Sequence, residues 1–173
     1  MSRRSTPASR VLNLLTEDHA KLRKLFVKFH SATLEARAAI ALQAIHGFQF
    51  HGDLEERLIY PALQAAIGAD VAVMRAREEH RKIHQSIRKL MRLRPSDEAC
   101  RIAVRALAEQ IQDHIEQEER HIFTRAKASR LDWQTLEMRV MARIRIIEAH
   151  RSREAKRNME TTHKVGCNNG VCA

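Results

Sequence analysis

The feature that most constrains the fold is a stripe of apolar residues that recurs every three or four positions in four successive segments. This step is the core-facing period of an α-helix. The first stripe contains Leu12, Leu15, His19, Leu22, Phe26 and Phe29, and the second contains Ala41, Ala44, Phe48, His51, Glu55 and Leu58. The third contains Val73, His80, His84, Ile87 and Met91, and the fourth contains Val104, Leu107, Ile111, His114, Glu118 and Ile122. Arg77 is the one break in the third stripe. The pattern predicts four helices whose core-facing sides carry titratable groups.

Breakers and capping residues place the helix ends. We expect helices over about residues 16–33, 35–60, 70–94, 96–129 and 132–158, with a short segment over 62–68. Pro61 is expected to stop the second helix, and Asp70 is a plausible N-cap of the third. No run alternates apolar and polar residues over the length of a strand. The fold class is therefore all-α, an up-down-up-down four-helix bundle with an additional C-terminal fifth helix.

Charge divides the chain more clearly than any linker does. The net charge is +10 over 173 residues, and the middle is nearly balanced while both ends are basic. We expect a bundle domain over 10–130, a basic helix over 131–160 and a flexible tail over 161–173. The tail contains Cys167 and Cys172, which could form a disulfide, hold a metal weakly or stay as two thiols. The apolar side of the fifth helix either caps the bundle or forms the face of a homodimer.

The composition argues against two classes of partner, membranes and nucleic acids. No apolar run approaches the roughly 20 residues of a membrane span, and no hydrophobic segment follows the basic N-terminus as in a secretory signal. We therefore expect a cytoplasmic protein without a membrane partner. The chain has one Trp and one Tyr, neither of them in an Arg-rich run. Since stacking on aromatic side chains is what single-stranded nucleic acids require, nucleic acid is an unlikely partner.

Seven titratable residues lie in register with the predicted core. They are His19, His51, Glu55, His80, His84, His114 and Glu118. Six of them form three pairs spaced i, i+4, so that both side chains of a pair lie on one side of a helix. Unpaired buried carboxylates cost several kcal/mol each, and a pair of divalent ions would neutralise them. Histidine and carboxylate ligands suit iron, manganese and zinc. His150 and Glu154 have the same spacing, but their surroundings are Arg-rich and predict a solvated pair.

These segments resemble the hemerythrin-like HHE cation-binding family. The resemblance covers roughly residues 10–128 and is carried by EDH at 17–19, HGDLEERLIYP at 51–61, EEHRKIH at 78–84 and HIEQEE at 114–119. It implies a non-haem di-iron centre with an oxo or hydroxo bridge. In that centre His80, His84 and His114 would bind one iron, His19 and His51 the other, and Glu55 and Glu118 would bridge them. The two-histidine iron would keep the open position for dioxygen.

Two alternatives concern the ligands. Glu119 could replace Glu118 only if the helix carries a local bulge, because on a regular helix the fifth residue after His114 points away from it. A ferritin-like di-iron site needs two Glu-x-x-His motifs in the core. That arrangement fits Glu118 with His121, but it fails on the second and third helices, where histidines outnumber carboxylates.

Several functions share such a site. We expect binding of dioxygen or a related small gas for storage, delivery or sensing, because the expected lining is apolar. That lining is Leu15, Leu22, Phe48, Leu58, Ile87 and Ile111. The alternatives are a di-iron redox enzyme that reduces peroxide or nitric oxide, an iron-handling protein that repairs iron–sulfur centres, and a regulator. An enzyme would need a redox partner protein and a polar group near the open position, for which Tyr60 and Glu119 are candidates. A regulator would contact its partner through the basic fifth helix.

Overall fold

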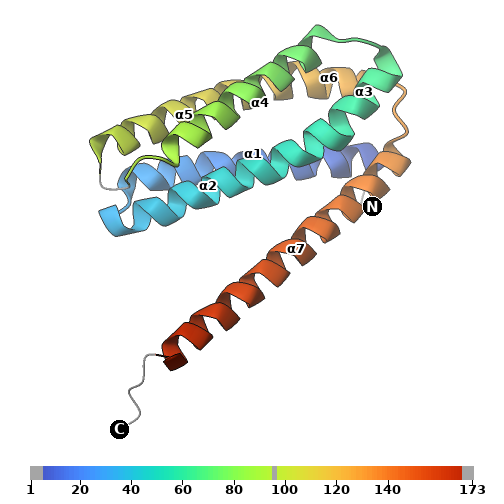
Figure 1. Cartoon of the computed structure of the whole chain (residues 1–173). Helices are drawn as coiled ribbons and strands as arrows, with labels where there is room; N and C mark the ends of the chain where they lie inside the picture. Colours follow the sequence, from blue (N-terminus) through green and yellow to red (C-terminus); the bar gives the residue numbers. More distant parts are fainter. Residues whose placement is uncertain (1–5, 95–96, 169–173) are drawn as a thin grey trace, which may run out of the picture.

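The protein is described by a computed structural model, which covers residues 6–94 and 97–168, apart from the side chains of 34 and 158–168. All regular structure in these ranges is helical. The elements are α1 (Pro7–Ser31), α2 (Leu34–Leu54), η1 (Glu55–Ile59), α3 (Tyr60–Ile67), α4 (Val71–Leu90), α5 (Glu98–Gln117), η2 (Glu118–Ile122), α6 (Phe123–Ala128) and α7 (Trp133–Asn168). Figure 1 shows four rods side by side, formed by α1, by α2 to α3, by α4 and by α5 to α6, with α7 outside them. This confirms the predicted four-helix bundle with a fifth helix.

The helix ends follow capping chemistry, with some differences from the prediction. α1 begins nine residues earlier than expected, because Thr6 accepts a hydrogen bond from the Ser9 amide at 3.2 Å and Pro7 occupies the first turn, where its missing N–H costs nothing. Asp70 caps α4 as predicted and accepts from the Ala72 amide at 2.8 Å. Gly68 ends α3 with a φ of 81°, a left-handed conformation that favours glycine. α7 continues to Asn168 rather than to about 158.

Two five-residue π turns interrupt the rods, and the first one corrects the prediction at Pro61. The second helix does not stop there, since α2, η1 and α3 follow without a break to Ile67. Proline normally breaks a helix because its ring collides with the carbonyl four residues earlier. Within η1 the Tyr60 amide donates to the carbonyl of Glu55, five residues back, so the chain is locally wider just before Pro61. Such turns are frequent at functional sites, and both of these begin at a predicted site glutamate.

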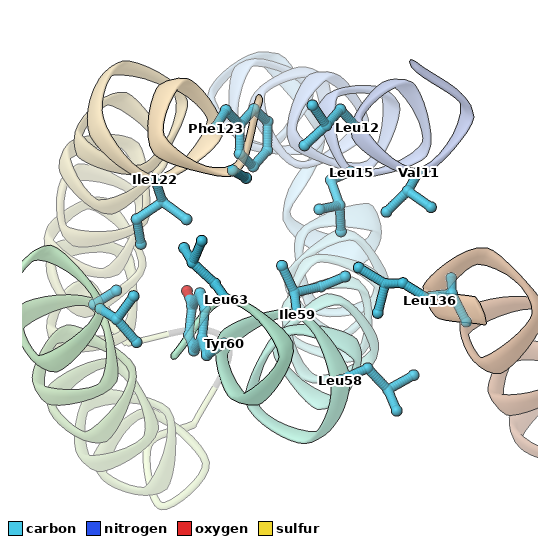
Figure 2. Close-up of a cluster of buried hydrophobic side chains, with 14 residues drawn as sticks. Val11, Leu12, Leu15, Leu58, Ile59, Tyr60, Leu63, Ile122, Phe123 and Leu136 are labelled. Atoms are coloured by element: carbon cyan, nitrogen blue, oxygen red, sulfur yellow. The ribbon is translucent and has the colours of Figure 1, made fainter. Parts of the chain in front are cut away.

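The apolar core consists of two clusters. One includes Leu15, Leu63 and Phe123 near the α3 and α6 end of the bundle, and Figure 2 shows its side chains converging from α1, η1, α3 and η2. The other includes Phe29 and Leu107 at the opposite end. The six polar residues that are fully buried in the described chain lie at neither end, because they occupy the middle turns of the four rods.

The buried side of α4 differs from its predicted stripe. Its buried residues are Val73, Ala76, His80, Ile83, Ile87 and Leu90. The stripe therefore passes through Ala76 rather than Arg77, which explains the break in the sequence pattern. Met91 is 58% exposed, so its place in the predicted stripe is wrong. His84 is half-buried beside this stripe rather than within it.

α7 packs on the bundle through its first turns. Leu136 and Val140 are buried, and Figure 2 shows Leu136 directed toward the bundle near Leu58 and Ile59. Farther along, Arg143 donates two hydrogen bonds of 2.6 and 2.7 Å to Asp53 on α2. Arg151 still contacts α2, since it donates to the His46 carbonyl at 3.2 Å and its guanidinium lies over the Phe50 ring. The end of α7 extends beyond the bundle in Figure 1. The side chains of Cys167 and Cys172 lie outside the described residues. In the described part of the chain, no helix is both long enough and apolar enough to span a bilayer.

Candidate metal centre

Four imidazoles meet in the middle of the bundle, one from each rod. His19 comes from α1, His51 from α2, His80 from α4 and His114 from α5, and each is at most 1% exposed. The Nε2 atoms of His19 and His51 are 2.8 Å apart, and those of His80 and His114 are 2.9 Å apart. Two ligands of one ion with metal–nitrogen bonds of about 2.1 Å come to a similar separation. The rings therefore form two pairs, each directed at a common point.

Two carboxylates lie between these histidine pairs. Glu55 is shared, since its Oε1 is 2.9 Å from His51 Nε2 and its Oε2 is 3.3 Å from His80 Nε2. Glu118 Oε2 is 3.3 Å from His19 Nε2 and 3.9 Å from both His51 and His114. Both glutamates are the first residues of a π turn. The wider turn begins where each carboxylate points inward, so the local helix geometry and the site coincide.

The donor atoms fit a pair of cations. One group of potential ligands consists of His19, His51, Glu55 and Glu118, and a second consists of Glu55, His80 and His114. In each group the ligand atoms lie within 4.8 Å of one another. The carboxylate atoms Glu55 Oε1 and Glu118 Oε2 are buried and have no hydrogen-bond partner, which is costly for charged oxygens. An ion beside each orphaned oxygen would remove this cost, so the residues present fit two bound metal ions that share Glu55.

His84 is the predicted ligand that the structure does not bring into either group. Its ring lies against Phe48 with a centroid separation of 5.7 Å, and the same phenyl ring contacts His80 at 5.2 Å. His84 thus stays one helical turn from the centre, half-buried at the edge of the α4 stripe. Burial lowers its pKa from the ordinary value, which favours the neutral imidazole that a metal ion requires.

The bulge that would allow Glu119 to replace Glu118 is present, because η2 spans Glu118–Ile122. It nevertheless leaves Glu118 innermost, at 1% exposure. Glu119 is half-buried and contacts the outer nitrogen of His19, with Oε1 at 2.8 Å from Nδ1. The two adjacent glutamates therefore contact different nitrogens of the same ring. Glu118 lies near His19 Nε2, and Glu119 lies near His19 Nδ1.

Tyr60 closes the centre from the α3 side. Its side chain is fully buried, and its hydroxyl lies 2.9 Å from Glu118 Oε1 and 3.4 Å from Glu55 Oε2. The hydroxyl donates to these carboxylate oxygens, because a carboxylate can only accept. Burial and the negative charge of Glu118 raise the pKa of Tyr60 well above its ordinary value. Tyr60 therefore remains a neutral donor that holds both central glutamates in place.

In the metal-free protein the centre retains protons. Burial alone would lower the pKa of His51, but the carboxylates of Glu55 and Glu118 outweigh it and raise that pKa to about 10. Burial also disfavours the charged form of His80. The carboxylates of Glu55 and Glu56 favour that form more strongly, and they raise the pKa of His80 to about 9. Burial likewise opposes ionisation of Glu55, yet its contact with His51 holds its pKa well below the usual range. Protons on the imidazoles thus neutralise the carboxylates when metal is absent.

The outer nitrogens of the imidazoles also face carboxylates, a feature that the sequence reasoning missed. The Nδ1 contacts are His19 with Glu119 at 2.8 Å, His80 with Glu56 at 2.8 Å, His114 with Glu79 at 3.2 Å and His51 with Asp18 at 4.0 Å. His51 Nδ1 has no hydrogen-bond partner at that distance. At His19, His80 and His114, an acceptor on Nδ1 fixes the imidazole tautomer and leaves Nε2 free to bind metal. Histidines that bind metal ions commonly donate their other nitrogen to a carboxylate in this way.

A repeat in the sequence could have revealed these outer contacts. HGDLEERLIY at 51–60 and HIEQEERHIF at 114–123 share the His, the Glu-Glu-Arg and the Ile with a following aromatic residue, and EDH at 17–19 corresponds to EEH at 78–80. In both halves the first glutamate of the pair points inward and the second reaches a histidine on another rod. The halves differ at Tyr60, which corresponds to Phe123, and at His84, which corresponds to Arg23.

The surroundings are apolar, and the remaining histidines lie elsewhere. All six residues of the expected lining are buried: Leu15, Leu22, Phe48, Leu58, Ile87 and Ile111. Phe123 stacks on His19 with the ring planes 7° apart. His121 is exposed, so it is not part of the buried cluster, and His46 is exposed as well. His150 and Glu154 are both exposed on α7, which agrees with their interpretation as a solvated pair.

Comparisons with known proteins agree with this geometry. The model of the hemerythrin HHE cation-binding domain matches residues 10–126. A crystal structure of a hemerythrin HHE cation-binding domain-containing protein from Mycobacterium kansasii superimposes with a TM-score of 0.66 and 25% identity, over 77% of this chain and 83% of that chain. A search of the curated proteins finds no match. With its bundle, its buried histidine–glutamate cluster and a family match over most of its length, the chain belongs to the hemerythrin HHE cation-binding domain family.

Proposed function

We propose that the chain holds two iron ions with an oxo or hydroxo bridge and binds dioxygen or a related small gas for storage, delivery or sensing. The observation that carries this proposal is the convergence of two histidine pairs on points that share Glu55. His19 and His51 would hold one ion, while His80 and His114 would hold the other with His84 as the remaining nitrogen ligand. Glu55 and Glu118 would lie between them. Iron accepts this mixture of imidazole and carboxylate ligands.

When bound, the iron pair supplies the positive charge and the redox chemistry that a ligand such as dioxygen requires. The chain itself supplies a water-poor enclosure, because the walls are buried aliphatic and aromatic side chains. Phe48 contributes most directly, since its ring contacts both His80 and His114. Tyr60 keeps Glu55 and Glu118 in place by donating to both. Such an apolar enclosure favours a small, weakly polar molecule over a charged metabolite.

An optical titration tests the proposal. The purified protein is loaded with iron, its iron is counted, and the sample is reduced without air. Dioxygen is then added and removed while the visible spectrum is recorded. We expect about two ions per chain and a band that develops with dioxygen and disappears on its removal. Protein that binds no iron under any loading condition would contradict the metal site, whereas loaded protein that does not respond to dioxygen would contradict gas binding.

One observation favours a second candidate, a di-iron redox enzyme that reduces peroxide or nitric oxide. The Tyr60 hydroxyl is a buried O–H donor beside the central carboxylates Glu55 and Glu118, and reduction of such substrates needs a proton donor nearby. The same titration separates the two functions. Irreversible conversion to the ferric state by peroxide, with turnover once an electron donor is supplied, would show that the protein is a redox enzyme and not a gas-binding protein.

A further inference from the structure

The carboxylates outside the histidine rings are arranged as systematically as the ligands inside. Three of the four central imidazoles have an Nδ1 atom within 3.2 Å of a carboxylate oxygen, contributed by Glu119, Glu56 and Glu79. The fourth, His51, has the Asp18 carboxylate at 4.0 Å. His84 forms no ion pair among the described residues, although it lies within electrostatic reach of Glu56. The carboxylate contacts at Nδ1 therefore belong to the imidazoles of the buried cluster.

These contacts join different helices and do not follow from helical spacing. Glu56 in η1 reaches His80 on α4, and Glu119 in η2 reaches His19 on α1. Each of the two glutamates follows directly after the central carboxylate of its π turn, Glu55 or Glu118. Each π turn thus places one carboxylate at the centre, where the ions would bind. It places the next carboxylate at the Nδ1 atom of a histidine from another helix.

A carboxylate that accepts a hydrogen bond from Nδ1 makes the opposite nitrogen a stronger electron donor. It also adds a negative charge close to the ions. The Glu56, Glu119 and Glu79 side chains are 40%, 32% and 21% exposed, so solvent screens part of this charge, but the imidazoles that they contact are buried and transmit it to the centre. Both effects stabilise an ion of higher charge more than an ion of lower charge. The consequence concerns the oxidation state of the centre and not merely the position of the rings.

We propose that the outer carboxylates, Glu56 above all, are positioning residues that also lower the reduction potential of the centre and thereby favour its oxidised state. This inference rests on the proposed iron centre. Glu56 is the best test because no arginine or lysine forms an ion pair with it among the described residues, and Arg77 acts on it only from a longer distance. Glu119 shares its charge with Arg23 at 3.3 Å, and Glu79 shares its charge with Arg75 at 2.8 Å.

The test is a redox titration of iron-loaded full-length protein, followed by its visible spectrum. Glu56→Gln keeps an acceptor oxygen for His80 but removes the charge, and Glu119→Gln does the same for His19. Glu109→Gln is the matched control, because Glu109 is an exposed carboxylate on α5 whose one ion pair within the described part of the chain is with Arg105. We expect both test variants to titrate at a higher potential. At the wild-type midpoint, the ratio of reduced to oxidised protein should rise about tenfold. This equals the lower end of the loss in metal affinity that follows removal of a carboxylate from a ligating histidine, if the loss falls mainly on the oxidised ion.

The outcomes separate this inference from the proposed function. Wild-type protein that cannot be loaded with iron contradicts the iron centre before any variant is made. If Glu56→Gln and Glu119→Gln retain both ions but titrate at the same potential as Glu109→Gln, the proposed charge effect is wrong. If only one of these two variants loses an ion, the midpoint potential of the other variant decides whether the charge effect is present. Loss of ions from both would reduce the outer carboxylates to a structural role and would also overturn the proposal.

Discussion

Metal binding should become stronger as the pH rises, because each ion must displace a proton from the buried cluster. The pKa of His51 is about 10 and that of His80 is about 9 in the metal-free protein, so both imidazoles are charged at neutral pH. His51 and His80 belong to different ligand groups. Below pH 8, each site should therefore bind with a slope of about one in log K per pH unit. The slope should fall to about one half near the pKa of each histidine and vanish above it.

The pKa values also give the size of the effect at pH 7. This pH lies about three units below the pKa of His51 and about two below that of His80. At about 1.36 kcal/mol per unit, proton displacement costs about 4 kcal/mol at the His51 site and about 3 kcal/mol at the His80 site. The raised pKa values mean that acid competes with metal well above pH 6.5, where ordinary imidazoles titrate.

The assay is a competition between the protein and a chromophoric chelator for Co²⁺ at pH 6, 7 and 8. The chelator's own pH dependence is measured separately and subtracted. We expect log K to rise by about one per pH unit at each site. A change of less than half that size at both sites would mean that the imidazoles are already neutral without metal. That result would refute the electrostatic picture of a proton-filled centre.

Three substitutions test other parts of the structure. Gly52→Ala places a Cβ 3.3 Å from the His80 ring, so we expect fewer bound ions per chain by metal analysis, and full occupancy would show that the ring can yield. Tyr60→Phe leaves buried carboxylate oxygens without their donor, which should destabilise metal-free protein by about 1.5–3 kcal/mol in urea unfolding; an unchanged midpoint would contradict this. His84→Ala should lower the metal content whereas His150→Ala should not, and equal results in the two variants would remove His84 from the ligand set.

Much of the fold and of the candidate site could be predicted because both depend on helical spacing. Apolar residues at steps of three and four identify the side of each helix that faces the core, and any histidine or glutamate in that register must be buried too. His51 with Glu55 and His114 with Glu118 are therefore recognisable as inward-facing pairs. Burial of all four residues agrees with that reasoning. The stripe was less decisive on α4, where the buried side passes through Ala76 and leaves His84 at its edge.

The sequence by itself determined the helices, the buried polar register and the presence of more ligands than a core can hold unpaired. Only the tertiary structure decided how these ligands divide into two groups that share Glu55, because that depends on the relative heights of four packed helices. It also decided the π turns that carry the chain through Pro61 and leave Glu118 innermost. The pairing of Glu56 with His80 and of Glu119 with His19 joins residues 24 and 100 positions apart. Local propensity contains no information about contacts at such separations, since they form only when the helices pack.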